Sequence, residues 1–90
     1  MFTKRDLQNG DIVETKIETR YIYLEIAGQG FLSSLFYAVD PSYYKEDLTA
    51  VNGNSAEDIV KVYRLINYFP SLDKALTANL PDKCLCWQRK

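Results

Sequence analysis

The chain alternates most clearly at Arg20-Tyr21-Ile22-Tyr23-Leu24-Glu25-Ile26-Ala27. Ile22, Leu24 and Ile26 fall on one face, and Tyr21, Tyr23 and Glu25 fall on the other. A period of two is typical of a β-strand. The glycines of Gly28-Gln29-Gly30 then predict a turn. This stretch therefore predicts a strand in a sheet with two different faces.

Further strands are expected on both sides of this stretch. Residues 11–17 alternate in the same way, after a capped turn at Thr3-Lys4-Arg5-Asp6-Leu7-Gln8 that Asn9-Gly10 closes. Residues 31–39 form a third apolar run, which the turn Asp40-Pro41-Ser42 ends. We expect one helical turn over residues 43–48 and a loop over residues 52–55.

Residues 58–66 support two interpretations. Ser55 and Asp58 make a plausible capping box, and the apolar residues that follow have helical spacing. The run Ile59-Val60-Lys61-Val62-Tyr63, however, is β-branched and aromatic, as strands prefer. The local pattern leaves helix and strand open.

The C-terminal third predicts a helix and a last strand. Ser71 is a suitable N-cap for a short helix over residues 71–79. Residues 84–89 close the chain as a strand, with Leu85 and Trp87 on the inward face and Cys84 and Cys86 on the other. We therefore expect an α+β fold that is mainly antiparallel β. It would be a small Src-homology-3-like barrel or curled sheet of about five strands, with one short helix before the last strand.

Composition limits the class of protein. The 90 residues predict a single domain over 1–90, and 47% of them are hydrophobic. Eleven Lys and Arg against twelve Asp and Glu give a net charge of -1, which argues against nucleic acid as the partner. The polar N-terminus and the lack of a long apolar run predict neither a signal peptide nor a membrane span.

Cysteines and catalytic motifs point away from enzymatic chemistry. Cys84 and Cys86 are too close in sequence for an unstrained disulfide, so we expect reduced thiols in the cytoplasm. The chain has no His, which removes the usual nucleophile pairs and imidazole metal ligands. It also lacks a nucleophile elbow and a phosphate-binding loop. We therefore predict a binding protein that is not an enzyme and needs no cofactor or metal.

Aromatic residues beside cations are the candidate binding residues. A flat ring next to a positive charge can stack on a base and pair with its phosphate. The pairs are found at Arg20-Tyr21-x-Tyr23, Tyr43-Tyr44-Lys45, Tyr63-Arg64 and Trp87-x-Arg89. Alternatively, Tyr63 and Trp87 belong to the core, and Tyr21 and Tyr23 cover the outer face of the sheet. The candidate ligand- or partner-binding residues are Arg20, Tyr21, Tyr23, Tyr43, Tyr44, Lys45 and Arg64.

Three blocks of the chain resemble a known family. The first is Phe2-Thr3-Lys4-Arg5-Asp6-Leu7-Gln8-Asn9-Gly10-Asp11-Ile12-Val13-Glu14, followed by Arg20-Tyr21-Ile22-Tyr23-Leu24. The second is Tyr44-Lys45-Glu46-Asp47-Leu48-Thr49, followed by Asp58-Ile59-Val60-Lys61-Val62-Tyr63-Arg64, and the third is Trp87-Gln88-Arg89-Lys90. In this order they resemble a family of small uncharacterised proteins of phages and prophages of Gram-positive bacteria. The opening Leu7-x-x-Gly10-Asp11-Ile12-Val13 also looks like the entry to a Src-homology-3-like or KOW-type barrel.

The resemblance implies a structure and a biological setting. It implies a strand over residues 58–64. It also implies a phage accessory protein in the cytoplasm of the infected bacterial host, a class whose members often antagonise bacterial defence. The chain departs from the family pattern after Ile17, where the usual glycine is missing, and over residues 28–39, which are more apolar than usual.

Two mechanisms of action are expected, and a third is an alternative to both. In the first, a homo-oligomer sequesters a nucleotide signalling molecule at its interface. In the second, the protein binds a host defence protein, as an anti-CRISPR does. The third is a nucleic-acid-binding small barrel. The run over residues 31–39 carries large apolar residues on both strand faces, so either the helix from Ser71 or a second subunit should cover one face. We expect the subunit, because one nine-residue helix is too small to cover a whole sheet face.

Overall fold

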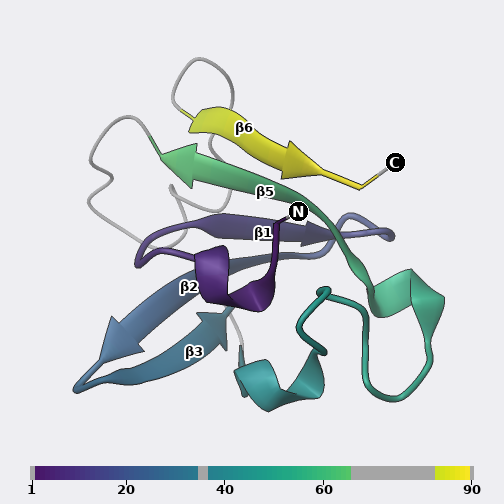
Figure 1. The fold of residues 1–90 in the computed structure, drawn as a ribbon, viewed down its shortest axis with the longest axis horizontal. Helices are drawn as coiled ribbons and strands as arrows, with labels where there is room; N and C mark the ends of the chain where they lie inside the picture. Colours follow the sequence, from purple (N-terminus) through teal and green to yellow (C-terminus); the bar gives the residue numbers. More distant parts are fainter. Residues whose placement is uncertain (1, 35–36, 66–82, 90) are drawn as a thin grey trace.

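The computed structural model describes residues 2–34, 37–65 and 83–89 of the chain, which are coloured in Figure 1. These residues form one antiparallel sheet with the strand order β4-β3-β2-β1-β5-β6. The strands are β1 (Ile12–Thr15), β2 (Arg20–Ile26), β3 (Gln29–Ser33), β4 (Ala38–Val39), β5 (Ile59–Leu65) and β6 (Lys83–Gln88). Three short 3₁₀ helices complete the described part: η1 (Lys4–Asp6), η2 (Pro41–Tyr43) and η3 (Ser55–Glu57).

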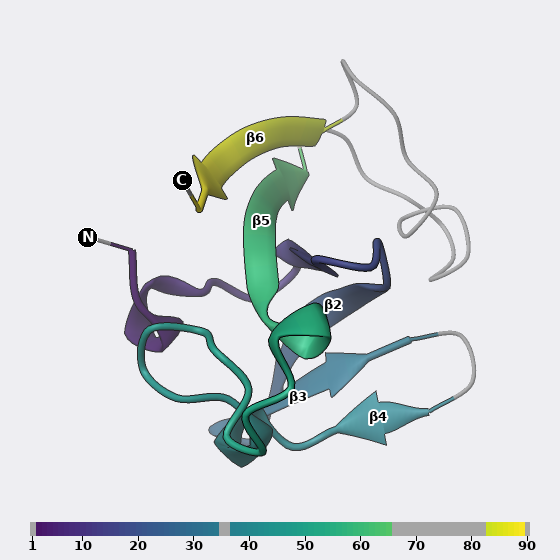
Figure 2. The same cartoon turned by 90° about the vertical axis from the view of Figure 1, so that its right-hand side faces the viewer.

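The expected β-rich architecture is confirmed, with six strands instead of about five. The sheet is curled but open within the described residues, because β4 and β6 form its two edges and do not pair with each other (Figure 2). The short helix predicted over residues 71–79 lies outside the described residues. In the part of the chain that the structure describes, no helix is long and apolar enough to cross a membrane.

Residues 58–66 are the point at which the sequence left two interpretations open. The structure forms strand β5 over Ile59–Leu65. Its central position between β1 and β6 buries Ile59 and Val62 completely. β5 is paired with a strand on each side, an environment in which β-branched residues pack well, whereas in a helix their side chains are restricted by the preceding turn. The strand interpretation is therefore confirmed.

The run over residues 31–39 is not one strand, contrary to the prediction. It is divided between β3 and β4, which pair as a hairpin through Leu32 with Val39 and Ser33 with Ala38. Between the two strands, the backbone amide of Ser34 donates to the carbonyl of Tyr37 at 2.8 Å. Leu32 and Val39 are therefore paired across two strands and do not lie along one strand, as the expectation of a covering subunit assumed.

The turn before β3 also differs from the prediction by one residue. It is formed by Ala27 and Gly28, whose φ angles are 52° and 81°. Positive φ at both central residues is typical of two-residue hairpin turns, and glycine adopts it without strain. Gln29 and Gly30 consequently belong to β3 and pair with β2.

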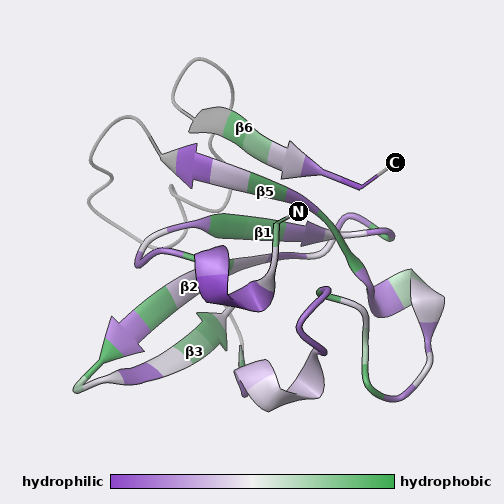
Figure 3. Ribbon diagram, viewed as in Figure 1, coloured by the Kyte–Doolittle hydropathy of each residue, from purple (hydrophilic) through white to green (hydrophobic). Residues whose placement is uncertain are grey.

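The larger buried cluster lies on one face of the sheet. Figure 2 shows the N-terminal segment and the loop that carries η2 and η3 on the same side of the strands. Figure 3 shows hydrophobic residues along β1, at the centre of the sheet, and hydrophilic ones in η1. The buried cluster comprises Leu7, Val13, Tyr21, Leu32, Tyr44, Leu48, Ala50, Ile59 and Val62. Tyr21 therefore points into this cluster, whereas Ile22 is buried on the other face, where it pairs with the fully buried Ile12 of β1.

A bulge in β6 separates two residues that the sequence placed together. Trp87 pairs with Val62 and Leu85 pairs with the next residue of β5, Tyr63, so Cys86 is an extra residue between them. An extra residue reverses the side-chain alternation. Trp87 accordingly packs against the core cluster, whereas Leu85 is on the opposite face and is 43% exposed. The prediction is confirmed for Trp87 and wrong for Leu85.

Candidate functional site

Arg20 is bonded to a neighbouring strand. Its Nε donates to Oε1 of Glu14 at 2.7 Å, across the pair that joins β2 to β1. Glu14 is buried, and Nζ of Lys61 approaches its other oxygen at 3.9 Å from β5. This arrangement stabilises a carboxylate inside the sheet, and it uses the cation that the sequence assigned to a ligand.

Arg64 has a similar structural role. Its Nε and Nη2 donate to the two carboxylate oxygens of Asp11 at 3.0 and 3.1 Å. Asp11 is 1% exposed and also accepts a bond from the backbone of Gln8 at 2.8 Å. A bidentate pair of this kind fixes the geometry of both partners. It ties the turn before β1 to β5.

Two of the predicted tyrosines are core residues. Tyr21 lies with its hydroxyl 3.0 Å from the hydroxyl of Tyr37, and burial raises its pKa above the usual value. Tyr44 donates from its hydroxyl to the carbonyl of Glu57 at 3.0 Å, and burial raises its pKa to about 12. Both rings are less than one-tenth exposed. They support the surface above them and do not offer a face to a ligand.

Tyr23 and Lys45 differ from each other in exposure. Tyr23 is half-buried, and its ring covers Gly30 on β3, where an added Cβ would lie 2.5 Å from the phenol oxygen. Gly30 thus provides space for the ring. Lys45 is exposed in the loop after η2, where its backbone amide donates to the carbonyl of Thr49 at 2.9 Å. The seven predicted residues therefore do not gather into one site.

Tyr43, one of the predicted binding residues, lies at the surface and is held there by side-chain hydrogen bonds. Its hydroxyl donates to Oε2 of Glu57 at 2.7 Å and accepts from Nδ2 of Asn52 at 2.6 Å. Asn52 also donates to the same Glu57 oxygen at 3.0 Å. The three side chains hold one another in place. The bonds from Tyr43 and Asn52 keep the pKa of the Glu57 carboxyl below its usual range.

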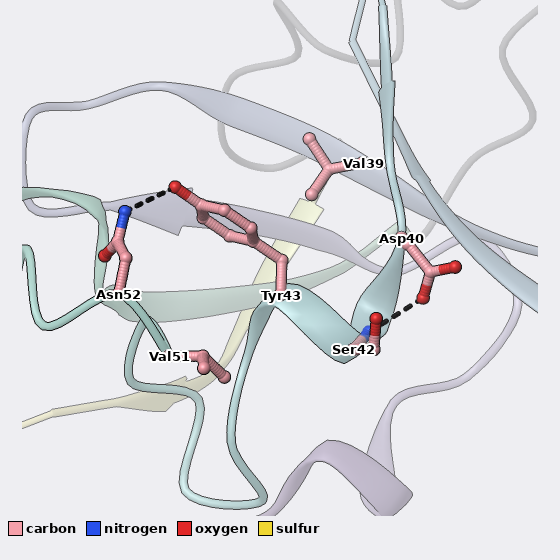
Figure 4. Close-up of a pocket in the computed structure, with 6 residues that line it drawn as sticks. All are labelled: Val39, Asp40, Ser42, Tyr43, Val51 and Asn52. Atoms are coloured by element: carbon pink, nitrogen blue, oxygen red, sulfur yellow. Dashed lines mark hydrogen bonds between the residues drawn. The ribbon is translucent and has the colours of Figure 1, made fainter.

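A cavity of about 330 Å³ lies beside this ring, and we call it the Tyr43 pocket. Its walls are Val39, Asp40, Ser42, Tyr43, Val51 and Asn52. Figure 4 shows the ring of Tyr43 between Val39 and Asn52, with Val51 below it. Tyr43 is 36% exposed and Val51 is 55% exposed, so the pocket presents apolar atoms to its surroundings.

The charged residue in the wall of the pocket, Asp40, is acidic. Asp40 caps η2 by accepting from the backbone amide of Ser42 at 2.9 Å, and this bond keeps the pKa of its carboxyl low. Asp40 and Glu57 are therefore both ionised at neutral pH. No Lys or Arg lines the pocket among the described residues. Lys4 lies nearby, but its Nζ donates to the carbonyls of Pro41 and Tyr44 at 3.1 and 2.9 Å.

Sequence reasoning missed most of this site, although a signal was present. The longest uncharged run of the chain covers residues 26–39, and a second one covers residues 48–56. The first supplies Val39 and the second supplies Val51 and Asn52. An acidic residue follows each run directly, Asp40 in one case and Glu57 in the other.

Neither a metal site nor a comparison with known proteins indicates a function. Within residues 2–34, 37–65 and 83–89, no group of three His, Cys, Asp or Glu side chains could hold a metal ion. No protein-family model matches the chain, and neither a curated protein nor a solved structure matches it. The function must therefore be inferred from the site itself.

Proposed function

We propose that the protein is a binding module that captures a partner polypeptide at the Tyr43 pocket. The partner places an apolar side chain against Val39, Tyr43 and Val51, and a neighbouring Lys or Arg faces Asp40 and Glu57. The observation that carries this proposal is an exposed apolar cavity with an acidic wall residue, Asp40, and with the carboxylate of Glu57 bonded to the Tyr43 ring that lines it. An acidic rim complements a basic residue and repels an anionic ligand.

The surroundings of the pocket fit a protein interface. Tyr37, which touches Tyr21 through its ring edge, is 53% exposed, and the hairpin that carries it has no charged residue. Interface cores are depleted of charges and enriched in tyrosine. Tyr43 is also pre-organised by Asn52 and Glu57, which lowers the entropy lost when a partner binds.

The phage setting and the fold are part of this proposal. The resemblance to phage and prophage proteins makes a host defence protein the first partner to test. A Src-homology-3-like barrel is supported by the pairing of β1 with both β2 and the late strand β5, and by the curl of the sheet. The open edges at β4 and β6 set the present arrangement apart from a closed barrel.

Nucleotide sequestration remains a prediction, with less support from the geometry. Arg20 and Arg64 were expected to hold phosphate, but each is bonded to a buried carboxylate. Thermal-shift measurements with cyclic and ADP-ribose-type nucleotides test this alternative. A ligand at a hundredfold excess over its Kd would stabilise the protein by about 2.7 kcal/mol. Light scattering behind a sizing column tests the expected homo-oligomer against a 10.4 kDa monomer.

Selection of peptides from a random displayed library tests the polypeptide proposal directly. We expect enrichment of sequences in which an apolar residue lies beside Lys or Arg. Val51→Lys should abolish their binding, because it places a cation in the pocket. Ile17→Lys is the matched control, since Ile17 is 61% exposed on the turn between β1 and β2, away from the pocket residues.

The same selection can refute the proposal. A library that yields no consensus, or one of acidic peptides, would contradict the predicted charge complementarity. Equal loss of binding by Val51→Lys and Ile17→Lys would show that the pocket is not the binding site. Asp40→Lys should weaken the selected basic peptides while leaving the melting temperature within a few degrees.

A further inference from the structure

A second cavity lies where three strand ends meet. The C-terminal ends of β1 and β6 and the N-terminal end of β5 are at the same end of the antiparallel sheet, on the right in Figure 1. A cavity of about 210 Å³ is formed there, and we call it the Arg89 cavity. Its walls are Lys16, Ser55, Asp58, Val60 and Arg89, none of which belongs to the Tyr43 pocket.

Arg89 is held rigidly in this cavity. Its Nε and Nη2 donate to the carbonyl of Ile59 at 3.2 and 3.1 Å, and Nη2 also donates to the carbonyl of Asp47 at 2.6 Å. The guanidinium lies 5.1 Å from the ring centroid of Trp87. Among the contacts of the described residues, Nη1 has no acceptor. The guanidinium is therefore oriented by its neighbours with one nitrogen left to donate.

Lys16 and Ser55 add further donors to the same cavity. The backbone amide of Lys16 donates to the carbonyl of Asp58 at 3.1 Å, which fixes the position of this residue. Its Nζ lies within 4 Å of no carboxylate in the described part of the chain, and the hydroxyl of Ser55 makes no hydrogen bond there. Three donors thus line one cavity without protein acceptors.

The acceptors at the cavity are fewer. Oδ1 of Asp58 already accepts from the backbone amide of Ala50 at 2.7 Å. Oδ1 of Asp47 already accepts from the hydroxyl and the backbone amide of Thr49 at 2.6 and 3.0 Å. These bonds, helped by the positive charge of Arg89, lower the pKa of the Asp47 carboxyl. An excess of charged donors favours a ligand that brings several acceptor oxygens.

We infer that the Arg89 cavity binds the phosphate group of a small molecule. Arg89 Nη1, Lys16 Nζ and Ser55 Oγ donate to its oxygens, and Val60 contacts the apolar part of the molecule. The negative charge of Asp58 opposes the phosphate and keeps its affinity modest. This site is independent of the Tyr43 pocket, so the failure of one proposal leaves the other in place.

Titration of isotope-labelled protein with inorganic phosphate, followed by NMR, tests the inference. Saturable shifts should appear in the backbone amides of residues 16, 55, 58, 60 and 89. Lys16→Met should weaken binding by about tenfold, the loss of one charge-assisted hydrogen bond. Lys45→Met is the control, because it removes an exposed cation whose side chain lines neither cavity. It should leave the affinity unchanged.

A second variant should act in the opposite direction. Asp58→Asn retains an oxygen that can accept from Ala50 and removes the opposing charge, so phosphate should bind several-fold more tightly. A nucleoside 5′-monophosphate and acetate form the other arms of the titration. Tighter binding of the nucleotide than of phosphate would identify an organic phosphate as the ligand, whereas equal binding would identify free phosphate.

Three results would overturn the inference. The first is the absence of saturable binding in the native protein. The second is an equal loss of affinity in Lys16→Met and Lys45→Met, which would indicate unspecific attraction to surface cations. The third is binding of acetate as tight as that of phosphate, which would show that the cavity does not recognise a phosphate group. If Asp58→Asn fails to fold, Ser55→Ala, at an exposed position, takes its place. It removes the Ser55 donor and should therefore weaken the binding of phosphate.

Discussion

At the centre of the sheet, Asp11 is buried and both of its oxygens are bonded to Arg64, whereas at the Tyr43 pocket Asp40 is exposed and its carboxylate caps the backbone of Ser42. In both regions the aspartate lies next to the end of a strand, β1 for Asp11 and β4 for Asp40. One carboxylate is used to hold two segments of the chain together, and the other faces solvent beside an apolar cavity. The difference separates the parts that stabilise the fold from those available to a partner.

Two adjacent tyrosines show the same contrast. Tyr44 is 3% exposed and packs in the core, and Tyr43 is 36% exposed at the pocket. Their rings meet edge to face at 5.5 Å, so the buried ring supports the exposed one. A candidate site cannot be read from residue type alone, because neighbours of the same type serve different purposes.

Paired valine substitutions should show the largest effect. Val62 is fully buried in β5, and Val51 is 55% exposed at the Tyr43 pocket. Val62→Ala should lower the free energy of unfolding by about 2–3 kcal/mol, since it removes buried methyl groups and leaves a cavity. Val51→Ala should change it by less than about 0.5 kcal/mol. Urea unfolding of both variants checks this, and similar values would contradict the proposed division.

The two aspartates should differ by a somewhat smaller amount. Asp11→Asn should cost about 2 kcal/mol, because Arg64 and the amide of Gln8 lose a charged acceptor. The value stays at the low end for a buried pair, since the Arg64 side chain is 40% exposed and can reach water. Asp40→Asn should be nearly neutral for stability and should weaken peptide binding. Thermal unfolding and peptide titration of each variant separate these outcomes.

The two tyrosines should show the smallest effect, with a distinct dependence on pH. Burial raises the pKa of Tyr44 from 10.0 to about 12. The folded state therefore holds this proton more tightly than the unfolded state, and the resulting stability is present below pH 10 and lost as the pH rises toward 12. Tyr44→Phe should lower the free energy of unfolding by about 1 kcal/mol at neutral pH. It should also remove the part of the alkaline loss of stability that comes from the titration of Tyr44.

Tyr43→Phe is the control for that measurement. It leaves the bond between Asn52 and Glu57 intact, so it should change stability at neutral pH by less than about 0.5 kcal/mol. Tyrosinate absorbance against pH, recorded with the unfolding curves, follows the titration. An alkaline loss of stability that is the same in Tyr44→Phe and in the native protein would contradict the assignment.

The elements of the fold could be predicted where a local pattern was strong. The alternation at residues 20–27 predicted β2, and the cap formed by Thr3 and Asp6 predicted the turn that the structure shows as η1, where the backbone of Thr3 donates to Asp6 at 2.7 Å. Asp40 and Pro41 likewise predicted the turn that became η2. These features depend on residues close in sequence, so the sequence by itself determined them.

Other features depended on contacts between distant segments, and only the tertiary structure decided them. The division of residues 31–39 into β3 and β4 and the extra residue at Cys86 are matters of register, which is set by the neighbouring strand. Whether Arg20 and Arg64 were available to a ligand depended on Glu14 and Asp11, which approach them only in the folded sheet. Val39, Tyr43 and Val51 likewise form one pocket because the loop after β4 folds back on itself, where Tyr44 pairs with Ala50.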